Sequence, residues 1–166
     1  MHGPLTMKVI FVRHAETEWN VRGIIQGQSD SKLTHRGLHQ TSALLAAFGA
    51  SDYRVECVYS SPLERARQMG QSLAECFRCP LMAEPALKEQ AFGQFEGMSS
   101  AQFLQYHPND ANALFNLDAE YCPPGGESLS HASQRIMRFL YNQEETRLNQ
   151  TICIVSHGHV SQGVLA

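Results

Sequence analysis

The chain has 166 residues, 43% hydrophobic and 17% charged, a length typical of one domain that buries roughly two thirds of its unfolded surface. No apolar run approaches the ~20 residues that cross a bilayer, and the composition is unlike that of fibrous or disordered chains. Thirteen Lys and Arg against sixteen Asp and Glu give a net charge of -3, which argues against a nucleic-acid-binding protein with a broad basic face. We therefore expect a globular domain without membrane or nucleic-acid partners.

The cysteines indicate a reducing environment. There are five, an odd number, and no N-terminal stretch has the basic start, apolar centre and cleavage site of a signal peptide, so we expect a cytoplasmic protein. Cys76 and Cys79 form one close pair, but a zinc site needs four ligands and no second pair exists. We therefore expect no metal, and we expect Cys57 and Cys153, which lie within apolar runs, to be core residues.

The first half of the chain predicts two strands and a helix between them. Residues 7–12 are apolar at both odd and even positions, a pattern typical of an interior parallel strand covered on both faces. Residues 1–6 are interpreted as an N-terminal extension or cloning remnant, and 7–166 as a single domain. Apolar residues near helical spacing predict a helix over 34–48, and residues 55–59 predict the second strand.

A strong helix start follows the second strand. Ser61 as the N-cap, Pro62 at the first helical position and Glu64 three residues after the cap would together form a capping box. Arg65 would then lie in the first turn of a helix that runs to about Phe77.

The second half predicts short helices and loops over 98–126, a long amphipathic helix over 128–147 and another doubly apolar strand over 151–155. The alternation of strands and helices favours a three-layer α/β/α domain with a mostly parallel sheet.

Polar residues follow three predicted strands. Arg13 and His14 follow the first, Arg65 lies just beyond the second, and His157 follows the last. Because ligands of open α/β sheets bind beyond the carboxyl ends of the strands, these side chains are expected to converge on one pocket. Arginines and a helix N-terminus favour a phosphate group there, and a neutral histidine is a competent nucleophile toward phosphorus.

These residues also carry a family resemblance. Five segments in collinear order, covering residues 7 to about 162, resemble the motifs of the histidine phosphatase superfamily, also called phosphoglycerate-mutase-like. They are 12–20 (VRHAETEWN) with 25–27 (IQG) and 33–37 (LTHRG), 60–66 (SSPLERA), 87–93 (LKEQAFG) with 96–97 (EG), 124–128 (PGGES) and 155–158 (VSHG). The resemblance implies the phosphoglycerate-mutase-like form of the α/β/α fold.

The resemblance also implies a role for each matching residue. His14 would be the nucleophile that becomes phosphorylated, and Glu89 would give a proton to the leaving alcohol and later take one from water. His157 would help to hold the phosphoryl oxygens. Phosphate-binding roles are implied for Arg13 and Arg65, with lesser contacts from Asn20 and Gln26. Neither a metal ion nor another cofactor is then required.

The acceptor decides between two activities in this family, because transfer to water gives a phosphatase and transfer to a second phosphoester position gives a mutase. No Lys or Arg lies between Lys88 and Arg135, whereas a mutase must bind the second phosphate and the carboxylate of bisphosphoglycerate. Hydrolysis of a small phosphomonoester with a weakly anionic alcohol part is therefore favoured. The possible apolar walls are Phe92, Phe95, Phe103, Tyr106 and Phe115, although such aromatics are more often core residues.

Two departures from the family pattern keep alternatives open. Gln162 stands where many members have arginine, and Ala166 ends the chain several dozen residues before the usual end of a member. A cofactor-dependent phosphoglycerate mutase and a shortened, non-catalytic phosphate-binding member therefore remain alternatives to the phosphatase. The sequence leaves the physiological substrate and the oligomeric state open.

Overall fold

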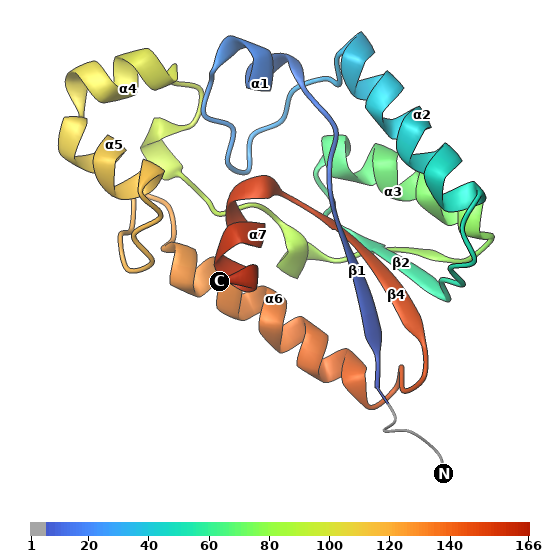
Figure 1. The fold of residues 1–166 in the computed structure, drawn as a ribbon. Helices are drawn as coiled ribbons and strands as arrows, with labels where there is room; N and C mark the ends of the chain where they lie inside the picture. Colours follow the sequence, from blue (N-terminus) through green and yellow to red (C-terminus); the bar gives the residue numbers. More distant parts are fainter. Residues whose placement is uncertain (1–5) are drawn as a thin grey trace.

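The structure, a computed structural model, describes residues 6–166. Its four strands form one parallel sheet in the order β1-β4-β2-β3, with bounds β1 Lys8–Arg13, β2 Cys57–Ser60, β3 Leu81–Ala83 and β4 Thr151–Ser156. Strands β1 and β4 lie side by side (Figure 1). Arg13 pairs with Ser156 at the last position of their ladder, so the carboxyl ends of these two strands lie level. Residues 1–5 of the expected N-terminal extension lie outside the described residues, and that expectation stays a prediction.

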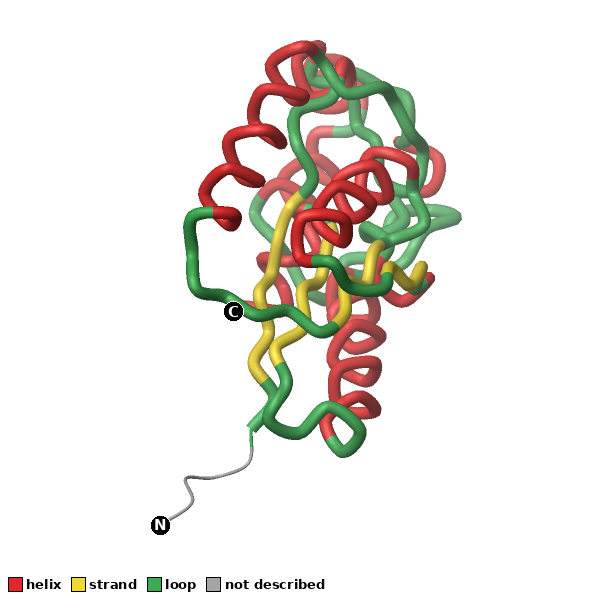
Figure 2. The backbone as a smooth tube through the Cα atoms, turned by 90° about the vertical axis from the view of Figure 1, so that its right-hand side faces the viewer, coloured by secondary structure: helices red, strands yellow, loops and turns green. Residues whose placement is uncertain are grey.

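Helices cover both faces of the sheet, which confirms the predicted three-layer α/β/α fold. Helices α2 (His35–Gly49) and α3 (Glu64–Phe77) lie on one side, and α6 (Leu129–Glu144) and α7 (Gly158–Leu165) lie on the other (Figure 1). In the view turned by 90°, the strands run between helices that lie on either side of them (Figure 2).

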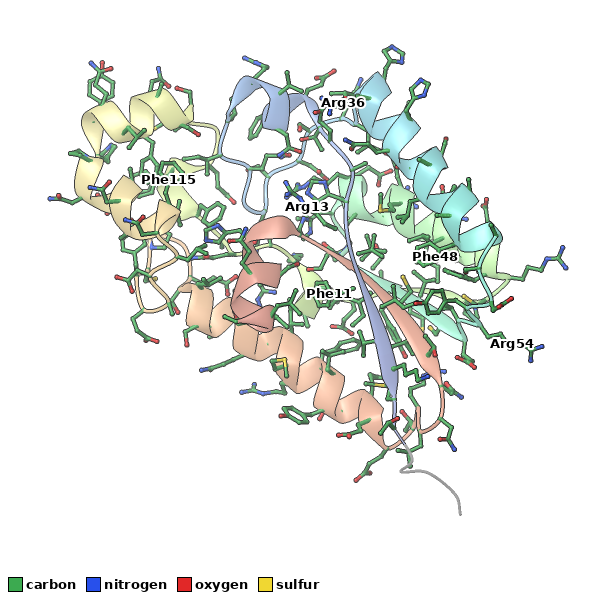
Figure 3. All side chains as sticks on the ribbon, in the orientation of Figure 1. Phe11, Arg13, Arg36, Phe48, Arg54 and Phe115 are labelled. Carbon is green, nitrogen blue, oxygen red and sulfur yellow. The ribbon has the colours of Figure 1, made fainter. Side chains whose placement is uncertain are left out.

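One hydrophobic cluster fills each interface between sheet and helices. Val12 and Leu73 belong to the cluster under α2 and α3, and Phe48 of α2 packs against it. Ile136 and Ile154 belong to the cluster under α6 and α7, and Phe11 packs against that one. Figure 3 shows Phe48 and Phe11 on opposite sides of the sheet. Successive residues of β1 therefore enter different clusters, as the alternation of side chains in a strand requires.

The prediction for the first strand was right about its faces and wrong about its place in the sheet. Within residues 6–166, β1 pairs only with β4 and lies at the edge of the sheet. Lys8 and Val9 at its start are exposed. The doubly apolar pattern arises because helices cover both faces of the strand, and this pattern does not report whether a second strand lies beside it.

The predicted capping box at Ser61 is wrong. Helix α3 begins at Glu64 with Leu63 at its N-cap position, and no side chain caps it. The Ser61 hydroxyl lies 2.8 Å from His157 Nε2 instead, and the Glu64 carboxylate pairs with Arg67. The predicted position of Arg65 in the first turn and the predicted helix end at Phe77 are confirmed.

Smaller elements cover the carboxyl edge of the sheet. Helix α1 (Glu18–Arg22) lies in the first crossover, and α4 (Ser100–Tyr106) and α5 (Pro108–Phe115) form a helical pair beside it (Figure 1). Two 3₁₀ helices, η1 (Pro85–Leu87) and η2 (Gly93–Phe95), punctuate the loop before α4. Cys57 and Cys153 are buried, as expected. Among the described helices, none combines the length and the apolar character that a membrane span requires.

Candidate active site

The predicted pocket residues do converge beyond the ends of the strands. Arg13 ends β1, and its side chain lies at the upper end of that strand in Figure 3. His14 follows it, and His157 follows β4. The two imidazole rings lie with their centroids 5.2 Å apart. The parallel β1–β4 ladder thus brings two histidines together that are far apart in the sequence.

His14 is held with one ring nitrogen protonated and the other, Nε2, accepting a hydrogen bond from Arg65 Nε. Its side chain is buried, and Nδ1 lies 2.7 Å from the carbonyl oxygen of Ala15. A carbonyl can only accept, so Nδ1 carries the proton and Nε2 keeps its lone pair. Burial, together with the nearby charges of Arg65 and Arg13, lowers the pKa of His14 to about 4. The imidazole is therefore neutral at ordinary pH, with Nε2 unprotonated.

Arg65 is a buried cation that faces this nitrogen. Only 2% of the residue is exposed, and its Nε lies 3.3 Å from His14 Nε2. The other side of the guanidinium is fixed, since Nη1 pairs with Asp30 at 2.9 Å and Nη2 donates to the Gly27 carbonyl at 2.7 Å. The Nε edge is left facing His14, which is the edge that an oxygen anion beside Nε2 would meet.

His157 is fully buried beside the same centre. Its Nε2 lies 2.8 Å from Ser61 Oγ, whereas its Nδ1 has no hydrogen-bond partner among the described residues. Ser61 Oγ accepts a hydrogen bond from the backbone N–H of Leu63 at 3.3 Å, so its own hydroxyl proton remains available to donate to His157 Nε2. Burial and the charges of Arg65 and His14 hold the pKa of His157 well below its usual range. This leaves a neutral ring with a buried nitrogen that lacks a partner.

Glu89 reaches the site from an irregular loop. Its carboxylate is buried and accepts three backbone N–H groups: those of Gln90 at 2.8 Å and Val160 at 2.7 Å on Oε1, and that of His159 at 3.0 Å on Oε2. Burial raises the pKa of Glu89, although these amides oppose the effect. A carboxyl group with a raised pKa can hold a proton at higher pH, as a general acid must.

Asn20 and Gln26 line the same cavity but are already engaged. Asn20 Oδ1 accepts both the backbone N–H and the hydroxyl of Thr17 at 3.0 Å, which completes the capping box of α1. Gln26 Nε2 donates to the Thr17 hydroxyl at 2.9 Å, and Gln26 Oε1 accepts from Ser31 at 2.9 Å. The structure therefore gives both amides a role in ordering the loop around the cavity.

The cavity has a volume of about 320 Å³ and two unlike walls. The inner wall is polar and comprises the cations Arg13 and Arg65 together with His14 and Glu89. The outer wall is neutral and includes Ile24, Phe92, Leu114, Phe115 and Gln162. Figure 3 shows Phe115 on α5, across from Arg13. Of the aromatics considered for this wall, Phe92 and Phe115 line the cavity, Phe95 and Phe103 are buried in a separate cluster with Phe92, and Tyr106 is exposed.

Sequence reasoning missed four residues that support the site. Ser61 contacts His157, Asp30 pairs with Arg65, and Arg135 and Glu127 bind the backbone around Glu89. Ser61 lies directly after β2 at the carboxyl edge of the sheet, a position that could have identified it. His159 also lines the cavity, and its ring packs edge-on against Phe92 at a centroid distance of 5.2 Å.

Curated proteins that are similar to this chain include a phosphatase and a probable mutase. A metal-independent phosphoserine phosphatase from Arabidopsis thaliana is 33% identical, and the match covers 95% of this chain and 66% of that protein. A probable phosphoglycerate mutase, GpmB, from Escherichia fergusonii is 32% identical, with coverage of 92% and 70%. The chain thus spans about two thirds of the length of these curated relatives.

Among solved structures, YhfR of Bacillus stearothermophilus superposes with a TM-score of 0.88 at 26% identity. The match covers 96% of this chain and 78% of that one. The family model of the histidine phosphatase superfamily (branch 1) matches residues 9–166, nearly the whole of the chain. The resemblance seen in the motifs is confirmed, and the chain belongs to the histidine phosphatase superfamily.

Proposed function

We propose that this chain is a metal-independent phosphomonoesterase that transfers a phosphoryl group first to His14 and then to water. The observation that carries the proposal is the environment of His14 Nε2. This nitrogen is unprotonated because Nδ1 is committed to the Ala15 carbonyl, and it faces a buried arginine at 3.3 Å. A neutral nucleophile beside a fixed cation is the arrangement that attack on a dianionic phosphate requires.

In the first step, the lone pair of His14 Nε2 attacks phosphorus and the bond to the ester oxygen breaks. The departing oxygen takes a proton from Glu89, so that an alcohol leaves and a carboxylate remains. Arg13 and Arg65 line the cavity and are proposed to bind the phosphoryl oxygens. His157 does not line the cavity, but its ring lies beside His14 and its Nδ1 has no partner among the described residues, so it is proposed as a further donor.

In the second step, a water molecule attacks the phosphohistidine. The Glu89 carboxylate takes a proton from this water, the N–P bond breaks, and inorganic phosphate leaves His14 neutral again. The cycle requires neutral His14 and protonated Glu89 at its start, so the rate should fall at low pH, where His14 gains a proton, and at high pH, where Glu89 loses one.

The inner wall supports catalysis without a metal ion. Its two arginines can offset the two negative charges of a phosphomonoester dianion. Glu89 is the only carboxylate among the described residues that line the cavity, and it accepts three backbone amides. The relative from Arabidopsis thaliana is itself named a metal-independent phosphatase.

The outer wall favours a phosphatase over a mutase. Both cations that line the cavity, Arg13 and Arg65, belong to its inner wall, and the outer wall adds none among the described residues. A second phosphate or a carboxylate on the substrate would therefore lie against neutral side chains. We propose a small phosphorylated metabolite with a neutral or weakly charged alcohol part as the substrate, and a cytoplasmic location for the reaction.

Release of phosphate from p-nitrophenyl phosphate in excess chelator tests this proposal. The parent chain should turn over, and His14→Ala should lose at least about 1,000-fold of the activity. The matched control is His39→Ala, an exposed histidine on α2, which should keep the parent rate. Turnover that survives His14→Ala, or that disappears with chelator, would contradict the proposal. Binding of vanadate without any turnover would favour the non-catalytic alternative.

A further inference from the structure

The segment that carries Glu89 has no regular secondary structure. After η1 ends at Leu87, residues 88–92 belong to neither helix nor strand, and η2 begins at Gly93. Backbone groups in such a segment lack the partners that a helix or sheet would provide, so other groups must satisfy them. A general acid also has to be held within a fraction of an ångström of its working position. The contacts that hold this loop in place are therefore expected to affect catalysis.

A single guanidinium binds the backbone of this segment. Arg135 lies on α6 next to Ile136, which is fully buried in the core and fixes the helix against the sheet. Its Nη1 donates to the carbonyls of Ala86 at 2.6 Å and Lys88 at 2.8 Å, and its Nη2 donates to the carbonyl of Glu89 at 2.8 Å. One side chain thus ties three carbonyls of the loop to a rigid helix.

Glu127 completes the attachment on the other side of Glu89. Its Oε1 accepts from Arg135 Nη2 at 2.5 Å and from the backbone N–H of Ala91 at 3.1 Å. The backbone N–H of Glu127 also donates to the Ala91 carbonyl at 3.0 Å, and the Glu127 carbonyl accepts from the Gln90 side chain at 2.8 Å. Burial would raise the pKa of Glu127, but the hydrogen bonds from Arg135 and His131 outweigh it and lower that pKa.

The preceding glycine permits this close approach. A Cβ atom at Gly126 would lie 2.3 Å from the carbonyl oxygen of Ala91, a distance that no side chain tolerates. The segment 125–127 and the loop at 90–91 therefore pack backbone against backbone. Together with Arg135, these contacts bind the loop on both sides of Glu89, while the first turn of α7 binds its carboxylate.

We propose that Arg135 and Glu127 are positioning residues that hold Glu89 where it can exchange a proton with the leaving group. Neither residue is among those that line the cavity, so both act through the backbone of residues 86–91. The inference rests on the proposed function of Glu89 as acid and base.

The test compares two substrates that need the acid to different extents. β-Glycerophosphate releases a poor leaving group that must be protonated, whereas p-nitrophenyl phosphate releases a good one. For Arg135→Gln, kcat should fall about 30-fold with the first substrate and less than about threefold with the second. The matched control is Arg138→Gln, an exposed arginine on the same helix, which should retain the parent rate with both substrates.

Milder variants keep the test decisive where Arg135→Gln does not fold. Arg135→Lys keeps the charge beside Glu127 but cannot reach three carbonyls at once, and Glu127→Gln keeps the shape without the charge. Both should show the same dependence on the leaving group with a smaller loss. Adding Arg135→Gln to Glu89→Gln should cost less than about twofold more, because the residue to be positioned is already disabled.

The outcomes separate the two proposals. One outcome overturns the positioning role alone. In that outcome, Glu89→Gln loses more kcat with the poor leaving group than with the good one, but all the Arg135 and Glu127 variants lose equally with both substrates. Equal losses for both substrates in Glu89→Gln itself overturn the acid role of Glu89 and the inference with it. We expect kcat to depend on the leaving group both in Glu89→Gln and in the Arg135 and Glu127 variants. We also expect no further loss beyond about twofold when Arg135→Gln is added to Glu89→Gln.

Discussion

The two walls of the cavity are built differently. The inner wall comes from the end of β1, from Arg65 in the first turn of α3 and from the loop that carries Glu89. His14, Arg65 and Glu89 are buried and each is held by two or more hydrogen bonds, whereas Arg13 is exposed. The outer wall comes largely from α5, α7 and loops, it is neutral, and Phe115 in it is 46% exposed. In the proposed function, the sheet edge supplies the phosphoryl chemistry, and the exposed residues of the outer wall, such as Phe115, are where substrate preference is expected to change at little cost to the fold. Phe92 and Leu114 of the same wall are buried in a hydrophobic cluster and are expected to be less tolerant of change.

The largest expected effect is on the inner wall. Arg65→Ala removes the buried cation beside His14 and leaves Asp30 without its partner, so kcat should fall by about 1,000-fold or more with every substrate. The matched control is Arg67→Ala, in the same turn of α3, where the side chain is 46% exposed and pairs with Glu64. Steady-state kinetics on two unlike esters check this, and a loss confined to one ester would contradict the substrate-independent role of this wall.

His14, which is buried, and His159, which is partly buried, predict a stability that depends on pH. The pKa values of His14 and His159 are lowered to about 4, whereas in the unfolded chain they lie near 6.5. The unfolded chain therefore binds more protons between these values, and stability is lost as the pH falls from 6.5 toward 4. Glu89, with a raised pKa, opposes this trend.

His159→Phe removes one of these titrations. Between pH 7 and pH 5 the free energy of unfolding should fall by about 2 kcal/mol less in this variant than in the parent. Denaturant unfolding at the two pH values measures the difference, and the exposed His39→Phe should behave like the parent. An identical pH dependence in His159→Phe would show that His159 is not buried in its neutral form.

A smaller effect is expected where Gly158 lies against Arg13. A Cβ atom at this position would lie 2.8 Å from Arg13 Cζ, so Gly158→Ala should displace the guanidinium and lower kcat/KM by about 10-fold. Gly49→Ala, at the end of α2, is the control because no atom lies within 4 Å of its Cβ position. Unchanged kcat/KM in Gly158→Ala would remove Arg13 from the set of phosphate-binding residues.

The smallest effect is expected on the outer wall. Gln162→Arg adds a cation to the neutral part of the cavity, so kcat/KM for a phosphoester that carries a carboxylate, such as phosphoserine, should rise about threefold to tenfold. The value for p-nitrophenyl phosphate should stay within about twofold. Gln71→Arg on the exposed face of α3 is the charge-matched control. Equal changes for both substrates would contradict the division of the cavity into two walls.

The sequence predicted best where one physical rule dominates. Doubly apolar strands, the helices expected over 34–48 and 128–147, and the convergence of polar residues at strand ends are confirmed because each depends on local pattern or on topology alone. The second of these helices ends earlier than expected, at Glu144. The edge position of β1 could not be predicted, because coverage of both faces produces the same pattern in edge and interior strands.

The supporting contacts of the site were beyond sequence reasoning for a different reason. Ser61 reads as an N-cap, but a tertiary contact with His157 takes up its hydroxyl. Arg135 lies on a helix, 46 residues away from Glu89 in the sequence, and it donates to backbone carbonyls. Because every residue has a backbone carbonyl, the residue types in the loop do not indicate this contact. Such contacts become visible only in three dimensions.

The most direct measurement is to trap the phosphorylated protein. A reaction with p-nitrophenyl phosphate, quenched in alkali and examined by mass spectrometry, should show one phosphoryl group on the peptide that contains His14. The group should be lost on acid treatment, as expected of a phosphohistidine, and should be absent from His14→Ala. A phosphoryl group on another residue, or turnover that continues in His14→Ala, would contradict the account.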